Sequence, residues 1–182
     1  MLAYKGFDPG LICRGYQFVM GLNTTEKAKC VANGFHCAAN PLDCLTYYSN
    51  MDRSEYYLVD AGGDIDEDDI DSKISCTHLT ILRKLSRKEF CLHALAYMVD
   101  HPKMECNSHV QREFGETSAG FAIVRGKNPK AIGHKGAILA LAKEYPQSIE
   151  IEQIGLVEVD GETILPGVWY DIDFTEKEVN AA

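Results

Sequence analysis

The chain alternates short runs of apolar and aromatic residues with small clusters of glycine, proline, asparagine and aspartate. Runs of about four to eight such residues bounded by turn-forming residues are typical of β-strands. Residues 55–60 are rich in tyrosine and branched side chains, and residues 149–152 alternate apolar with charged positions. Further strands are predicted at residues 3–8, 12–19, 74–82, 121–124, 137–142, 155–159 and 164–170.

Two other stretches carry the signals of a helix start. Asn40 is a good N-cap residue, and Pro41 suits the first helical position, where its missing N–H costs nothing. Ser86 and Glu89 have the spacing of a capping box, and the helix that they begin is expected to end before Pro102. The sequence therefore predicts one short helix and one of medium length.

Together these elements predict an α+β fold. The N-terminal half is expected to be mixed, with two short-to-medium helices against a sheet, and the C-terminal region to be mostly β. Residues 1–100 form the first predicted domain, residues 101–118 a polar linker, and residues 119–182 a β-rich C-terminal module.

Charge narrows the functional classes. The 182 residues carry a formal net charge of −9, whereas a nucleic-acid binder needs a basic surface to neutralise phosphates. We therefore expect no direct nucleic-acid binding, and a partner that is itself basic. The N-terminus lacks the apolar segment of a signal peptide, and no window reaches the length of a membrane span, so a cytoplasmic protein with reduced cysteines is expected.

Residues 64–71 are the most biased stretch, with six acids in eight residues. An EF-hand loop that begins at Asp64 would need glycine where Asp69 stands and glutamate where Ser75 stands, so calcium binding is not expected. The stretch is either a solvated, mobile loop or an anionic surface that competes with phosphates for a basic groove. In the second case the partner-binding residues are Asp64, Asp66, Glu67, Asp68 and Asp69.

Histidines and cysteines offer other chemistry. His101, Cys106 and His109 lie close in sequence, but none of the cysteines shows the paired C-x-x-C spacing of a zinc site. Adjacent residues of a strand point to opposite faces, so His36 is badly placed to activate Cys37. We therefore predict no metal, no cofactor and no catalytic residue.

One enzymatic alternative stays open. Arg14, His36 and the pair Tyr47-Tyr48 could line a nucleotide pocket of the kind that ADP-ribosyltransferases have. The glutamate expected to stabilise the sugar cation would have to be Glu55 or another poorly placed acid. The simpler interpretation is that these aromatic residues belong to the core.

Several motifs carry a resemblance to a domain found in phage and prophage proteins. They are Lys5-Gly6-Phe7, residues 13–18, and the stretch from Gly34-Phe35-His36 to Tyr47-Tyr48, so that the resemblance covers about residues 4–98. Residues 131–138 and 159–170 resemble the closing module of the same proteins. Many of those proteins carry an array of short repeats between the modules, which is reduced here to about residues 118–136. The resemblance implies no assigned activity.

A small, acidic protein of this kind is also similar to anti-CRISPR proteins. That resemblance implies a stoichiometric inhibitor of the type II RNA-guided DNA nuclease, which occupies the basic groove of the nuclease or of its guide complex in the cytoplasm of a bacterial host. Its carboxylates would pair with arginines of the nuclease. The alternatives are an ADP-ribosyltransferase-like enzyme and a structural or assembly protein of the phage particle, and a homodimer is compatible with each of the three.

Overall fold

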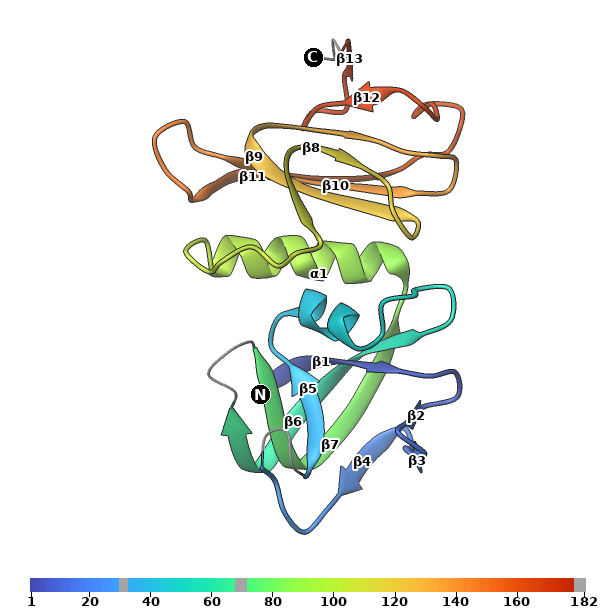
Figure 1. Ribbon diagram of the computed structural model, residues 1–182, viewed down its shortest axis with the longest axis vertical. Helices are drawn as coiled ribbons and strands as arrows, with labels where there is room; N and C mark the ends of the chain where they lie inside the picture. Colours follow the sequence, from blue (N-terminus) through green and yellow to red (C-terminus); the bar gives the residue numbers. More distant parts are fainter. Residues whose placement is uncertain (30–32, 68–71, 179–182) are drawn as a thin grey trace. The chain divides into compact units, whose positions relative to one another are not determined.

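A computed structural model describes residues 1–29, 33–67 and 72–178. The chain divides into two compact units, Met1–Ser86 and Arg87–Ala182, and each is described here by itself. Both units are built mainly from β-strands (Figure 1).

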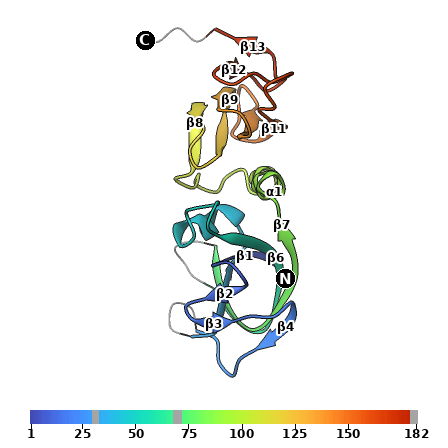
Figure 2. The ribbon, with the colours of Figure 1, turned by 90° about the vertical axis from the view of Figure 1, so that its right-hand side faces the viewer.

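The first unit is a small closed barrel with an added strand. Its two longest strands, β6 and β7, pair antiparallel along most of their length. β1 pairs with the other side of β6 and β5 with the other side of β7, while β1 and β5 meet at the single pair Tyr4 and Ala38, which closes the ring. Figure 2 shows this unit from the side. The strands are β1 (Leu2–Phe7), β2 (Ile12–Cys13), β3 (Tyr16–Gln17), β4 (Gly21–Thr24), β5 (Phe35–Ala38), β6 (Glu55–Glu67) and β7 (Lys73–Leu85).

Inward-facing residues of the barrel strands form its core. Phe7, Val59, Leu79 and Ile81 are almost completely buried there, together with Cys76. Because β6 and β7 each have 13 residues, they can bend around this core and pair with different neighbours at their two ends.

The single helix of this unit among the described residues is the 3-10 helix η1 (Pro41–Thr46). The side chain of Asn40 caps it by accepting a hydrogen bond of 3.1 Å from the backbone N–H of Leu42, and Pro41 follows at the first position, as the sequence predicted. Leu42 and Leu45 are buried beneath the helix. η1 leads the chain from β5 to the tyrosine pair that follows it.

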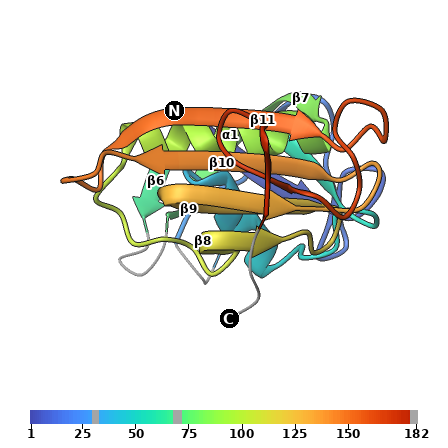
Figure 3. The same ribbon diagram turned by 90° about the horizontal axis from the view of Figure 1, so that it is seen from above.

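The second unit begins with α1 (Arg87–Asp100), which starts directly after Ser86, as the capping box predicted, and ends before Pro102. The helix packs on β10 and β11, and Phe90, Ala94 and Leu95 are among its buried residues. β9 pairs in parallel with both β8 and β10, and β11 pairs antiparallel with β10 (Figure 3). The strands are β8 (Val110–Glu116), β9 (Phe121–Ile132), β10 (Ile138–Glu144), β11 (Ile151–Glu158), β12 (Trp169–Tyr170) and β13 (Glu176–Lys177).

The predicted α+β class is wrong, since the fold is mostly β. The N-terminal half does not place two helices against a sheet: within the described residues it holds only η1, and α1 belongs to the second unit, where it packs on β10 and β11. Residues 12–19 are not one strand, because the chain turns at Arg14-Gly15 between β2 and β3. The segment predicted as a linker contains β8. In the described part of the chain, no helix is long and apolar enough to cross a membrane.

Candidate functional site

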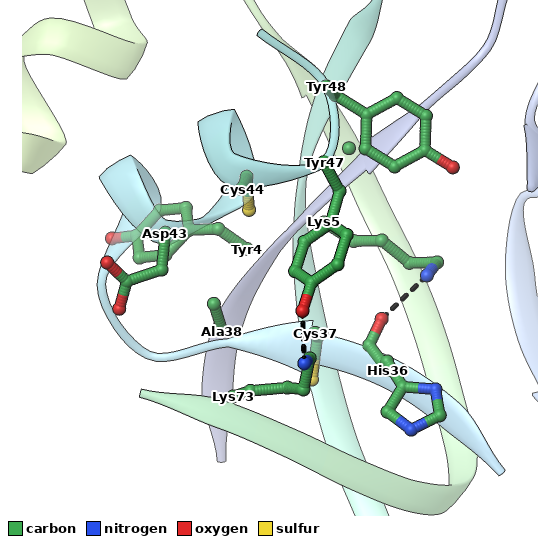
Figure 4. Close-up of a pocket in the computed structure, with 11 residues that line it drawn as sticks. Tyr4, Lys5, His36, Cys37, Ala38, Asp43, Cys44, Tyr47, Tyr48 and Lys73 are labelled. Atoms are coloured by element: carbon green, nitrogen blue, oxygen red, sulfur yellow. Dashed lines mark hydrogen bonds between the residues drawn. The ribbon is translucent and has the colours of Figure 1, made fainter. Parts of the chain in front are cut away.

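The first unit contains a cleft at the place where β1 and β5 separate. Tyr4 and Ala38 are the one residue pair that joins these two described strands. Beyond this pair β1 and β5 are not paired with each other, and residues of both strands line a cavity of about 720 Å³. A smaller cavity of about 50 Å³ adjoins it and shares five of its lining residues (Figure 4). The shared residues are Lys5, His36, Tyr47, Tyr48 and Lys73.

Lys5 on β1 lies at the centre of this cleft. Its side chain is buried, with only 5% of the residue exposed, and its amine donates a hydrogen bond of 2.6 Å to the carbonyl of His36. The same amine lies 3.6 Å from Cys13 Sγ and about 5 Å from the ring centroids of Phe7 and Phe18. No carboxylate of the described residues forms an ion pair with Lys5. This lysine is therefore a buried cation surrounded by neutral groups.

Arg14 approaches the cleft from the β2–β3 hairpin. Arg14 and Gly15 have φ angles of 49° and 79°, which define a type I′ turn. Glycine adopts such angles easily, whereas an arginine with positive φ is strained. The Arg14 side chain is exposed and makes neither a hydrogen bond nor an ion pair within the described ranges. The turn beside the cavity therefore contains an arginine whose backbone conformation is strained.

Further basic groups surround the cavity. Burial lowers the pKa of His36, and the charges of Lys5, Lys73 and Arg14 lower it further, so the site favours the neutral imidazole. Lys73 donates a hydrogen bond to the hydroxyl of Tyr47 and lies 4.6 Å from the centroid of that ring (Figure 4). Asp8 is the one carboxylate among the described residues that line the larger cavity. The cleft is positively charged in a protein whose net charge is −9.

Aromatic side chains form the walls. Tyr16, Phe18 and Phe35 are in mutual contact, with ring centroids 4.6–5.4 Å apart. The Tyr48 ring lies directly on β1 at Gly6, where a Cβ atom would come within 2.6 Å of the ring. Glycine at this position therefore allows the ring to form part of the wall.

The structure brings together all four residues that were proposed from the sequence for a nucleotide pocket. Arg14, His36, Tyr47 and Tyr48 line one cavity. Glu55 does not line it, and the Glu55 carboxylate accepts hydrogen bonds from Lys84 and from the backbone N–H of Gly10. Sequence reasoning did not select Lys5 as a site residue, although Lys5-Gly6-Phe7 is one of the motifs that carry the family resemblance.

The acidic residues lie elsewhere. Asp64, Asp66 and Glu67 are exposed at the end of β6 and do not line the cleft, and Asp68 and Asp69 lie outside the described residues. Within the described ranges, no group of three or more histidine, cysteine, aspartate or glutamate residues could hold a metal ion. The proposed partner-binding role of the acids stays a prediction.

The comparisons with known proteins bear on the first unit. A family model described as "Domain of unknown function (DUF7666)" matches residues 1–93, which is more than half of the chain and includes the whole cleft. No curated protein and no solved structure matches the chain.

Proposed function

We propose that the N-terminal unit of this chain, which belongs to the DUF7666 family, binds a small anionic molecule, with phosphate as the anionic group that fits best. The observation that carries the proposal is Lys5, a buried cation that has no carboxylate partner among the described residues. Burying an unpaired charge is costly, and buried charges are normally paired. A bound anion would supply the missing counter-charge.

Arg14 and Lys73 support the same function. Together with Lys5 they give the cavity three cationic side chains against the single carboxylate of Asp8. A phosphate group accepts several charge-assisted hydrogen bonds at once, and arginine is well suited to donate two of them. The strained backbone of Arg14 is explained if its side chain contributes to binding, because strain of this kind is often retained at functional sites.

Binding fits the cleft better than turnover does. An ADP-ribosyltransferase-like reaction needs a carboxylate beside the sugar, and Glu55 is engaged with Lys84 outside the cleft. Asp8 would be the remaining acid for that role. Incubation with a nucleotide donor separates the two cases, because an enzyme leaves a mass change on its target and a receptor does not.

The test is a calorimetric titration of the full chain with pyrophosphate at low ionic strength, for the wild type and for Arg14→Asn. We expect Arg14→Asn to bind about 10- to 20-fold more weakly, at the lower end of the effect of losing a hydrogen bond to a charged group, because the Arg14 side chain is exposed. Thermal stability should be unchanged or higher, because Asn-Gly is a preferred type I′ turn. Arg53→Asn, which removes the same charge at an exposed site outside the cleft, is the control. A wild type that does not bind pyrophosphate, or an Arg14→Asn variant with unchanged affinity, would contradict the proposal.

A second candidate is the stoichiometric inhibition of a type II RNA-guided DNA nuclease by a protein of phage or prophage origin. The observation that favours it is the set of carboxylates at the end of β6, where Asp64, Asp66 and Glu67 are all exposed. Such groups could pair with the arginines with which the nuclease reads DNA.

Titration against guide-loaded nuclease tests this candidate, with DNA binding and cleavage both measured. Wild type should abolish both activities at a near-equal molar ratio. Neutralising the five acids 64, 66, 67, 68 and 69 to Asn or Gln should abolish inhibition and preserve the circular dichroism spectrum. The control neutralises five exposed acids of the second unit: Asp100, Glu105, Glu158, Glu162 and Glu176. Inhibition that survives in the folded quintuple variant would exclude the acidic stretch as the binding surface.

A further inference from the structure

We infer that the ligand of the cleft is a nucleotide, whose base stacks on Tyr16 while its phosphates meet Lys5 and Arg14. This inference rests on the proposed anion binding and specifies the chemical class of the ligand. The observation that supports it is the aromatic wall of Tyr16, Phe18 and Phe35, with which an inorganic anion would make no stacking contact.

The Tyr16 ring is an exposed platform on a rigid base. Of this residue 48% is exposed, although its ring centroid lies 4.6 Å from that of Phe18 and 5.4 Å from that of Phe35. Phe18 in turn contacts Phe7 at 5.3 Å, so the platform continues into the barrel core. A ring fixed in this way loses little conformational freedom when a base stacks on it.

The hairpin places this platform beside the cations. Arg14 and Tyr16 are separated by Gly15 alone in the β2–β3 turn, and both line the cavity that Lys5 lines from β1. Cation and ring are therefore adjacent, as the phosphate and base of a nucleotide require. Asn33, Asn50 and Ser54 also line the cavity and offer hydrogen bonds to a base or a sugar.

Size agrees with this class of ligand. The cavity of about 720 Å³ falls within the usual range of small-molecule sites, roughly 300–1,000 Å³. A nucleic-acid polymer is a poorer fit, because the net charge of −9 would repel the phosphates outside the cleft. A single nucleotide places its negative charge only where the three cations lie.

The experiment titrates the full chain with ADP, GDP, CDP, UDP and pyrophosphate. At least one nucleotide should bind about tenfold or more tightly than pyrophosphate, because stacking adds to the anion contacts. Tyr16→Leu should weaken the binding of that nucleotide by about 5- to 20-fold and leave pyrophosphate affinity within about twofold. Tyr16→Phe, which keeps the ring, should bind as the wild type does.

The controls separate this inference from the proposed function. Tyr145→Leu removes a tyrosine of similar exposure, 45%, in the second unit and should change no affinity. If pyrophosphate binds as tightly as every nucleotide, or if Tyr16→Leu weakens both ligand types equally, the inference falls while anion binding stands. If none of the five compounds binds, both the inference and the proposed function fall.

Discussion

Glu144→Gln is expected to lower the free energy of unfolding of the second unit by about 3–5 kcal/mol, the usual cost of removing one partner from a buried ion pair. The Glu144 carboxylate, almost completely buried on β10, accepts hydrogen bonds of 2.7 and 3.0 Å from Arg112 and one of 2.8 Å from Arg125. These two arginines stand directly opposite each other on β8 and β9. A neutral amide on β10 would leave the two positive charges of Arg112 and Arg125 side by side on the neighbouring strands β8 and β9.

The pKa of Glu144 gives this prediction a pH dependence. Hydrogen bonds from Arg112 and then Arg125 lower the pKa of the carboxyl below its ordinary value. Because the folded state favours the ionised form, the wild type has this stabilisation fully above the unfolded-state pKa and loses it as pH falls through the folded-state pKa. Wild type and Glu144→Gln should therefore differ most near pH 7 and converge in acid.

Thermal unfolding and hydrogen exchange of the β9 and β10 amides would measure the effect. Glu152→Gln is the matched control, because Glu152 pairs with Lys143 at 2.8 Å on a partly exposed surface. Exposed pairs of this kind contribute about 0–1 kcal/mol. If the two variants lose similar stability, the buried network does not hold the sheet together.

Local signals in the sequence were reliable where a few neighbouring residues determine the geometry. Asn40 and Pro41 start η1, and Ser86 precedes α1, because capping depends only on backbone groups within one turn. Pro102 follows the end of α1 for the same local reason.

The barrel could not be predicted in this way. Asp66 and Glu67 have low strand propensity, yet they extend β6, because they pair with Ser75 and Ile74 of β7, whose own sequence favours a strand. The ring closes through pairs such as Tyr4 and Ala38, which are far apart in sequence. The Arg14-Gly15 turn was missed because arginine is rarely found with positive φ.

Only some residues of the candidate site could be predicted from the sequence, for a related reason. Arg14, His36 and Tyr47 stood out as polar or aromatic residues in apolar surroundings, and all three line the cleft. Lys5 lines the cleft only because the pairing of β1 with β5 ends beside it. Where this pairing ends depends on residues that are far apart in sequence. No motif of adjacent residues encodes that end of the pairing.

Lys5→Met is therefore the most informative change to the cleft, and we expect it to weaken pyrophosphate binding by about 10- to 150-fold, the equivalent of about 1.5–3 kcal/mol for a hydrogen bond to a charged group. Methionine fills a similar volume among Phe7, Phe18 and Cys13. The free protein should change in stability by only about 1–2 kcal/mol, because relief from an unpaired buried charge offsets the hydrogen bond lost at the His36 carbonyl.

Ligand-dependent thermal shifts measure both parts of this prediction. At a pyrophosphate concentration of about 100 times Kd the wild type should gain about 2.7 kcal/mol, and Lys5→Met at the same concentration should gain much less. Lys84→Met removes an equal charge at an exposed site of the same unit and should keep the full shift. If Lys5→Met keeps it as well, the buried amine is not the partner of the anion. The buried lysine would then need another explanation, since its hydrogen bond to the His36 carbonyl and its contacts with Phe7 and Phe18 supply no negative charge, and no carboxylate of the described residues pairs with it.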